Sequence, residues 1–314
     1  MTAAKQTAFL FPGQGSQSLG MMAALAEEFP AIRETFDEAS GILGFDLWIL
    51  CQEGPEADLN RTENTQPAML VADIATWRAW RTLGGPVPGA FAGHSLGEYA
   101  ALVAAGALEF TDAVRIVRRR GQLMQGAVPE GEGAMAAIIG LDDETLEAVC
   151  KDVAQGEVVS CANFNAPGQI VIAGDSAAVE RACKAATEAG ARRALPLPVS
   201  VPSHCALMRE AADSLAETLQ SVSVMSPEVP VWHNADVATQ EAPDAIRASL
   251  SRQLWQPVQW TRTIEALVSQ GTEHFAECGP GKVLAGLNKR IARGAGFTVL
   301  DSRERMEQLK EELS

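Results

Sequence analysis

The sequence predicts an α/β protein with a large parallel-sheet core and a smaller inserted subdomain. Two short apolar segments, Thr7–Phe11 and Gly89–Ala92, predict the core, because each reads as a strand that ends in a glycine-containing turn. Between residues 128 and 200 the element order changes to βαββαβ, which predicts the insertion. Ligands of parallel α/β sheets collect at the carboxyl ends of the strands, so we expect the functional site there.

Length and composition exclude several functional classes. The chain has 314 residues, of which 47% are apolar, enough to bury one large core plus a small one. Its net charge of −15 argues against nucleic acid or an anionic membrane as the main partner. We find no membrane span, signal peptide, disulfide framework or zinc pattern in the sequence, so we expect a cytoplasmic protein without a metal.

The strand Gly89–Ala92 runs into Gly93-His94-Ser95-Leu96-Gly97, and the Ala-rich stretch Tyr99–Ala107 after it reads as a helix. A G-x-S-x-G between a strand and a helix is typical of a nucleophile elbow, in which the sharp turn presents the serine and the helix start offers free N–H groups to an oxyanion. We therefore predict an α/β-hydrolase-like core with Ser95 as the nucleophile.

The insertion follows the ferredoxin-like order βαββαβ. We place its boundaries at residues 128 and 200, which leaves residues 1–127 and 201–314 as a discontinuous large core. Its predicted elements are a strand at Ala134–Ile139, a helix at Asp142–Ala154, strands at Val158–Asn163 and Gln169–Gly174, a helix at Ser176–Glu188 and a strand at Arg192–Leu197.

The large core then resumes with alternating helices and strands. The predicted elements are a helix after His204, a strand at Val229–Asn234, helices around Ala242–Leu254 and Gln259–Gln270, a strand at Thr272–Glu277 and a helix after the sequence GPGKVL.

A serine nucleophile needs a base, and the chain has four histidines. We favour His204, because it lies in a Pro-bounded loop where the chain re-enters the large core, and such loops commonly carry function. The ring of His94 is expected to point away from Ser95 and to pack against the sheet. His233 and His274 lie in strand-like stretches, where a structural role is expected.

The turn PGQGSQ, residues 12–17, resembles a nucleotide-binding loop but fails that test, since Ser18 stands where the third glycine of G-x-G-x-x-G belongs. A glycine-rich strand end can instead bring a backbone N–H close to a substrate carbonyl, as a second oxyanion donor. A plain tight turn is the alternative.

Thr111–Gln125 reads as an amphipathic helix with Thr111 as N-cap. Arg120 falls in the middle of its apolar arc, four residues from both Ile116 and Met124, where an unpaired guanidinium is costly. It therefore needs an anionic partner. An internal Asp or Glu and a substrate carboxylate both satisfy that need, and the planar guanidinium suits a carboxylate.

With these residues assembled, the chain resembles the malonyl-CoA:acyl carrier protein transacylases, the loading enzymes of bacterial fatty-acid synthesis. The similarity spans nearly the whole length. It rests on FPGQGSQ, GHSLGEYAAL, RGQLMQ, GAMAAIIGL, NFNAPGQIVIAG, PVSVPSHCALM, RQLWQPVQW and GPGKVLAGL.

The resemblance implies a Ser-His dyad, in which Ser95 accepts the acyl group and His204 is its base. It makes Arg120 the clamp for the malonyl carboxylate. It assigns the oxyanion hole to the backbone N–H groups of Gln14 and Leu96. The main-chain carbonyl of Gln253 is implied to orient the histidine in place of an acid. The chain departs from many relatives in one place, where it has HNADV and they resemble NNVDV, so a role copied to the side chain of His233 is in doubt.

The resemblance implies transfer of malonyl from malonyl-CoA to the phosphopantetheine thiol of acyl carrier protein, which supplies extender units for fatty-acid synthesis. It implies no metal or redox cofactor, and a monomer is expected. Acyl carrier proteins are generally acidic, so we expect a basic surface near the mouth of the cleft. The candidate residues for that surface are Lys184, Arg192, Arg193, Lys282, Lys289 and Arg290.

Two alternatives remain open on the sequence. A serine hydrolase of thioesters or esters would use Ser95 and His204 with water as acceptor, but it gains little from a buried Arg120. A non-catalytic scaffold that binds a carrier protein would have no reason to keep both Ser95 and His204 in these contexts.

Overall fold

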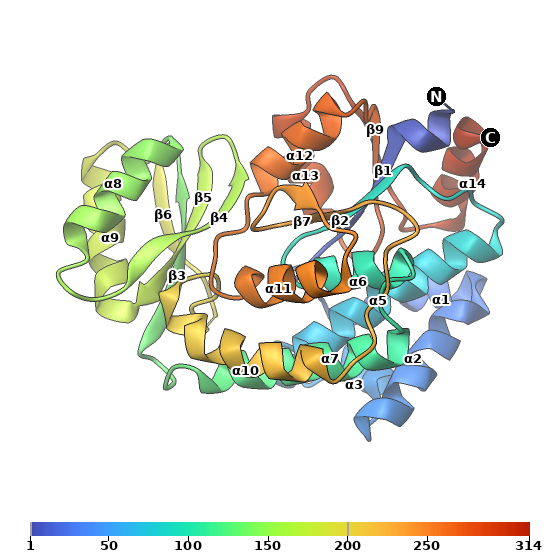
Figure 1. Cartoon of the computed structure of the whole chain (residues 1–314), viewed down its shortest axis with the longest axis horizontal. Helices are drawn as coiled ribbons and strands as arrows, with labels where there is room; N and C mark the ends of the chain where they lie inside the picture. The colour runs from blue at the N-terminus through green and yellow to red at the C-terminus, as the bar shows by residue number, and fades with distance from the viewer. Residues whose placement is uncertain (1, 200) are drawn as a thin grey trace.

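The computed structural model describes residues 2–199 and 201–314, which form two sheets with their helices (Figure 1). The larger sheet has the strand order β10-β9-β1-β2-β7-β8, in which all neighbours pair in parallel except β7 and β8. Its strands are β1 (Thr7–Phe11), β2 (Ala90–Gly93), β7 (Val231–His233), β8 (Ala238–Thr239), β9 (His274–Glu277) and β10 (Gly296–Val299).

Helices cover both faces of this sheet, because alternate side chains of its strands are apolar on both sides. Phe9 and Phe11 of β1 pack into one core cluster with Trp80 of α5, whereas Ala8 and Leu10 pack on the other face with α12 and α13. The helices before the smaller sheet are α1 (Ala23–Glu28), α2 (Pro30–Leu43), α3 (Leu47–Glu53), α4 (Glu56–Leu59), α5 (Thr62–Thr82), α6 (Gly97–Ala104) and α7 (Phe110–Gly126). Those after it are α10 (Arg209–Gln220), α11 (Pro243–Gln253), α12 (Trp260–Ser269), α13 (Val283–Ile291) and α14 (Arg303–Leu313), and short 3-10 helices span Ala3–Gln6 and Ala206–Met208.

The smaller sheet is antiparallel, with the order β4-β5-β3-β6. Its inner residues, such as Ile138 and Ile172, pack against its two helices, while Met135 and Val171 face the other way. The elements are β3 (Gly133–Ile139), α8 (Asp143–Val153), β4 (Val159–Ala166), β5 (Gln169–Asp175), α9 (Ser176–Glu188) and β6 (Arg193–Pro196).

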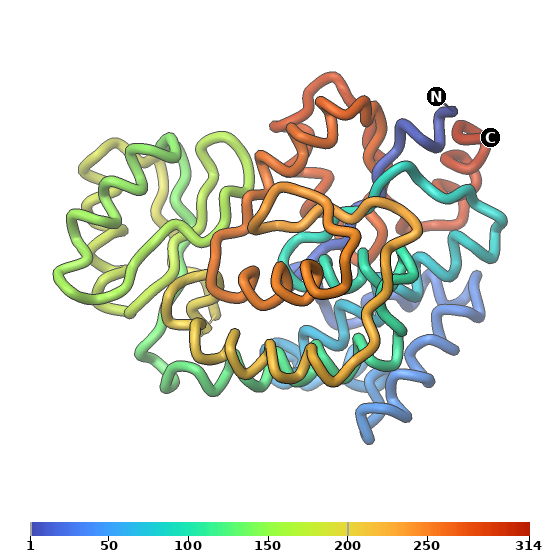
Figure 2. Tube along the Cα trace, viewed as in Figure 1, coloured from blue at the N-terminus to red at the C-terminus, as the bar shows by residue number. Residues whose placement is uncertain are grey.

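The predicted fold class is confirmed: a mixed α/β fold with a parallel sheet and a separate antiparallel sheet whose elements run βαββαβ. Figure 2 shows the chain entering the smaller unit after α7 and leaving it toward α10. The domain boundaries at 128 and 200 stay a prediction, and Met1 and Ser200, the outer ends of two predicted ranges, lie outside the described residues.

One predicted local feature is wrong. Helix α7 begins at Phe110, so Glu109 is its N-cap and Thr111 lies inside the first turn. Phe110 is the first residue of the helix, and its side chain is buried in the core.

Helices α1 to α5, strand β10 and helix α14 were not anticipated. Helix α5 is buried on nearly all sides and contains Pro67, so its sequence lacks the amphipathic period that indicates a helix.

Within residues 2–199 and 201–314, none of the helices has both the length and the apolar character that crossing a membrane requires. Over the same residues, no group of three His, Cys, Asp or Glu side chains is arranged to hold a metal ion.

Candidate active site

Ser95 lies in the turn between β2 and α6, with a φ of 50°. A non-glycine residue in the left-handed region is strained, and such strain concentrates at functional sites. The turn can be this tight because its flanks are glycine: a Cβ on Gly93 would overlap the backbone of Gly97, and a Cβ on Gly97 would overlap the carbonyl oxygen of Phe11. The turn is therefore pressed against the end of β1, and Ser95 lines a cavity at this edge of the sheet.

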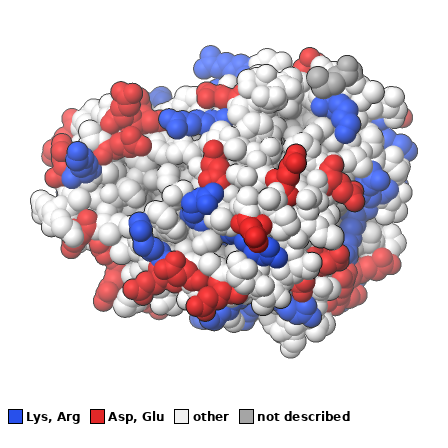
Figure 3. Space-filling view, in the orientation of Figure 1, with Lys and Arg blue, Asp and Glu red and all other residues white. Residues whose placement is uncertain are grey.

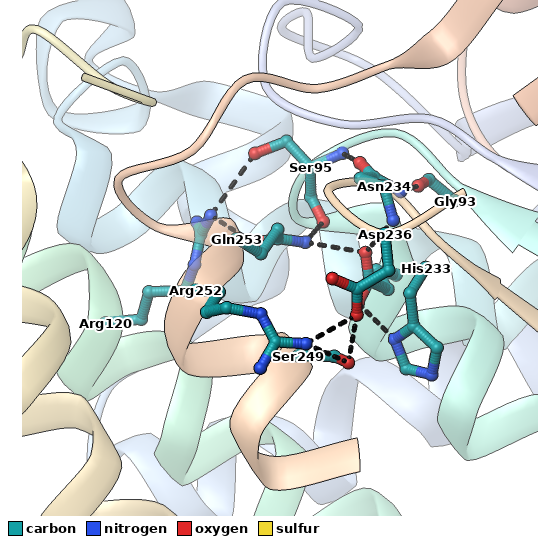
Figure 4. A network of polar contacts seen from close by, with 10 residues as sticks. Gly93, Ser95, Arg120, His233, Asn234, Asp236, Ser249, Arg252 and Gln253 are labelled. Atoms are coloured by element: carbon teal, nitrogen blue, oxygen red, sulfur yellow. Dashed lines mark hydrogen bonds and ion pairs between the residues drawn. The ribbon is translucent and has the colours of Figure 1, made fainter. Parts of the chain in front are cut away.

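Asn234 holds both sides of this turn (Figure 4). Its Oδ1 accepts a hydrogen bond from the N–H of Ser95, and its Nδ2 donates to the carbonyl of Gly93, both at 2.6 Å. Asn234 directly follows β7, the parallel neighbour of β2. Sequence reasoning missed this residue, although its place at the carboxyl end of a strand was a usable signal.

His204 is the histidine that meets Ser95. Its Nε2 lies 2.8 Å from the Ser95 Oγ, and its Nδ1 lies 2.7 Å from the main-chain carbonyl oxygen of Gln253. Because a carbonyl oxygen only accepts, Nδ1 carries the ring proton, and Nε2 is free to accept the serine proton. His204 also has a positive φ, 61°, and its N–H donates to the carbonyl of Leu254 at 3.1 Å.

The surroundings of His204 keep its ring neutral. Burial, followed by the positive charge of Arg120, lowers the pKa of His204 to about 3, while the hydrogen bond to the Gln253 carbonyl acts in the opposite direction. An unprotonated imidazole beside a serine hydroxyl is the state that a general base requires.

Arg120 reaches the same hydroxyl from α7. Its side chain is only 1% exposed, and its Nη2 donates to the Ser95 Oγ at 3.2 Å and to the Gln253 Oε1 at 2.9 Å. Burial lowers the pKa of Arg120. Across residues 2–199 and 201–314 its guanidinium forms no ion pair and its Nε has no hydrogen-bond partner. No Asp or Glu of the described residues therefore pairs directly with it, although the buried Glu98, which Gln253 links to Arg120, acts to raise its pKa.

The two expected oxyanion donors lie beside the same cavity. Gln14 follows the end of β1, Leu96 begins the turn into α6, and both line the cavity with Ser95. Neither backbone N–H donates a hydrogen bond to another described residue. Both donors are therefore available to a carbonyl oxygen placed above Ser95.

The Gln253 side chain joins several of these groups, in addition to its carbonyl contact with His204 (Figure 4). Its Nε2 donates to the carbonyl of Ser95 at 2.7 Å and to the Glu98 Oε2 at 3.0 Å, and its Oε1 accepts from Arg120. Glu98 is a further residue that sequence reasoning missed. It is fully buried in the first turn of α6, where a charged residue without a buried partner would be costly.

The cavity above Ser95 has a volume of about 210 Å³ and lies between the two sheets. Met135 and Val171 of the smaller sheet form one wall, and Leu284 and Leu287 of α13 contribute from the larger unit. The cavity therefore combines an apolar lining with a buried cation, which suits a short acyl group that ends in a negative charge.

The other three histidines lie apart from the Ser95 hydroxyl. His94 packs on the ring of Trp260, at 5.3 Å between centroids, and its Nε2 lies 2.8 Å from the Asn165 Oδ1. His233 and His274 lie in β7 and β9, as their strand-like contexts predicted.

Comparison with protein-family models matches residues 8–296 to the acyl transferase domain. The chain is 59% identical over 286 residues to the malonyl CoA-acyl carrier protein transacylase of Escherichia coli (strain K12), a match that covers 91% of this chain and 93% of that protein.

Solved structures of similar proteins have the same fold. The malonyl CoA-acyl carrier protein transacylase of Coxiella burnetii is 50% identical, with a TM-score of 0.98 over 100% of this chain and 99% of that one. A malonyl-transacylase solved in complex with its type II PKS acyl-carrier protein is 54% identical, with a TM-score of 0.96 over 97% of this chain and 99% of that one.

Proposed function

This chain belongs to the malonyl CoA-acyl carrier protein transacylase family, and from that premise we propose that Ser95 carries a malonyl group from malonyl-CoA to the phosphopantetheine thiol of acyl carrier protein. One observation carries the assignment to these residues: the Ser95 Oγ lies 2.8 Å from the His204 Nε2 and 3.2 Å from the Arg120 Nη2. A nucleophile, its base and a buried carboxylate-binding cation thus meet at one atom.

In the first half-reaction, His204 takes the proton of Ser95 while the serine oxygen attacks the thioester carbon of malonyl-CoA. The negative charge moves to the former carbonyl oxygen, where the N–H groups of Gln14 and Leu96 stabilise it. When the tetrahedral intermediate collapses, the C–S bond breaks. The CoA sulfur leaves with the proton that His204 held, and malonyl remains as an ester on Ser95.

The second half-reaction runs the same steps with a different thiol. His204 takes the proton of the phosphopantetheine thiol, the sulfur attacks the ester carbon, and the C–O bond to Ser95 breaks. His204 then returns the proton to the serine oxygen. The apolar lining of the cavity limits the access of water, which favours transfer over hydrolysis.

Arg120 gives this site its preference for malonyl in our proposal. A malonyl carboxylate supplies an anion that can pair directly with the buried guanidinium, and the Nε, which has no hydrogen-bond partner among the described residues, is a donor for it. An acetyl group supplies no such anion, so it leaves the cation uncompensated.

We expect the reaction to need no metal or organic cofactor and to take place in the cytoplasm, with supply of extender units for fatty-acid synthesis as its purpose. The predicted boundaries of the inserted subdomain, 128 and 200, and a monomeric state belong to the same proposal.

Intact mass spectrometry tests the proposal directly. The protein is mixed with malonyl-CoA, with and without phosphopantetheinylated acyl carrier protein. We expect a malonyl adduct on the protein alone, its loss when the carrier is added, and a matching gain of mass on the carrier. An adduct that forms equally on a Ser95→Ala variant would contradict the assignment of the nucleophile.

A further inference from the structure

Glu98 lies three residues beyond Ser95 and is fully buried, yet the reaction described above does not use it. Both of its carboxylate oxygens are engaged. Oε1 lies 2.7 Å from the His233 Nδ1, while Oε2 accepts from the backbone N–H of Asn234 at 2.9 Å and from the Gln253 Nε2 at 3.0 Å. The Asn234 N–H and the Gln253 Nε2 can only donate, so Oε2 is the acceptor of both. An ionised carboxylate also only accepts at Oε1, and His233 then carries its proton on Nδ1.

Two of the residues that donate to Glu98, Asn234 and Gln253, also form hydrogen bonds with groups of the proposed reaction. Asn234 accepts from the N–H of Ser95 and donates to the carbonyl of Gly93, so it holds the turn that presents the nucleophile. Gln253 contacts Ser95, and it also bonds Arg120 through Oε1 and His204 through its main-chain carbonyl. Figure 4 shows Asn234 and Gln253 on opposite sides of the Ser95 turn.

These contacts restrain a strained arrangement. Ser95 and His204 both have positive φ values, 50° and 61°, and residues in sparsely populated backbone regions persist only where the surroundings hold them there. Without the Glu98 carboxylate, the Asn234 N–H would lose its acceptor, and one N–H of the Gln253 amide would be left unpaired in a buried site. Both side chains would then have reason to move, and the groups they contact would move with them.

We propose that Glu98 is the positioning residue of this site: anchored by His233, its carboxylate fixes Asn234 and Gln253 and thereby aligns Ser95, His204 and Arg120. The inference rests on the proposed function, because it takes those three residues as the reacting and substrate-binding groups. It also gives a role to His233, whose Nδ1 lies 2.7 Å from the Glu98 Oε1. The Nδ2 of an asparagine at position 233 would be equally far from the backbone, so that side chain could also donate to Glu98.

The test compares Glu98→Ala with Glu98→Gln by two readouts and a melting curve. The first is the rate at which a fluorophosphonate labels Ser95, which depends on Ser95 and His204. The second is the ratio of malonyl to acetyl transfer in a single turnover, which depends on Arg120. Displacement of reacting groups by about 1 Å can cost about 100-fold, so we expect Glu98→Ala to lower labelling by about 10- to 100-fold and to lower the ratio as well.

Glu98→Gln is expected to restore most of both values. Its amide oxygen can accept from Asn234 and Gln253, and its NH₂ group can donate to the other tautomer of His233. Asp73→Ala is the control for loss of a buried carboxyl group, because Asp73 is also fully buried, does not line the cavity and its carboxyl oxygens have no hydrogen-bond partner among the described residues. We expect the control to keep the parent values.

If Glu98 had a purely structural role, Glu98→Ala would lower the melting temperature and leave both readouts unchanged in the folded protein. Parent values of Glu98→Ala for either readout would therefore overturn the proposal. If Glu98→Ala does not fold, His233→Leu and His233→Asn take its place, with slower labelling expected only for the leucine variant. Equal labelling of those two would overturn the proposal. A malonyl adduct on Ser95→Ala would instead overturn the proposed function, so the two failures are distinguishable.

Discussion

Arg120 donates to the Oγ of Ser95 across 3.2 Å, so the buried cation touches the nucleophile as well as the space in front of it. The same nitrogen bonds the Gln253 Oε1 at 2.9 Å. A substrate carboxylate that pairs with this guanidinium is therefore held within reach of the serine oxygen. In the proposed mechanism, selection of the acyl group and its alignment for attack depend on this one side chain.

Replacement of Arg120 by Ala should weaken malonyl transfer by about 10- to 1000-fold, because it removes a charge-assisted contact of roughly 2–4 kcal/mol. It also removes the uncompensated cation that disfavours a neutral acyl group, so the preference for malonyl over acetyl should collapse or invert. The measurement is kcat/KM for malonyl-CoA and acetyl-CoA. Arg119→Ala, on the exposed side of the same helix, is the control. Equal loss of both activities together with a lower melting temperature would show a structural role instead.

Replacement of Ser95 by Ala should abolish the malonyl adduct, whereas His204→Ala should slow its formation by about 100- to 10,000-fold and leave the fold intact. The reason is that the Ser95 hydroxyl has no other histidine nitrogen within hydrogen-bond distance among the described residues. Single-turnover mass spectrometry measures both effects. Transfer at the parent rate by His204→Ala would require another base.

The pH dependence of Ser95 labelling by a fluorophosphonate should reflect the pKa of His204, which burial and Arg120 lower to about 3. A lowered pKa keeps the imidazole neutral as the pH falls, so the rate should stay level through the range near 6.5 in which an ordinary histidine becomes protonated. Arg120→Ala removes one cause of the lowering and should move the loss of activity to higher pH. A loss centred near the ordinary histidine value in the parent protein would contradict this account.

Transfer to acyl carrier protein should weaken as the salt concentration rises, whereas hydrolysis of the malonyl-enzyme should not. Figure 3 shows acidic and basic side chains interspersed on one face of the molecule. Lys282 and Lys289 line a surface groove beside α13, while Lys184 is already paired with Glu180 at 2.7 Å. We therefore expect Lys282→Glu with Lys289→Glu to slow transfer and to reduce its salt dependence. Lys184→Glu is the control, and salt-independent transfer would count against this docking surface.

Local patterns predicted much of the fold. Apolar runs that end in glycine turns indicated β1 and β2 within one residue of their observed ends, and the βαββαβ order indicated the smaller sheet. The position of Arg120 on its helix predicted a buried guanidinium, which the structure has. Helix α5 was not predicted, because it is buried on nearly all sides and its sequence therefore lacks the alternation of apolar and polar faces that indicates a helix.

The tight turn at Ser95 can be recognised from consecutive residues alone, because its glycines and its place between a strand and a helix are local properties. Which partners meet there depends on the folded chain. Ser95 and His204 are 109 positions apart, and Glu98 lies 135 and 155 positions from His233 and Gln253. Such contacts depend on the order of strands in the sheet and on the packing of α11 against the turn, which no window of neighbouring residues encodes.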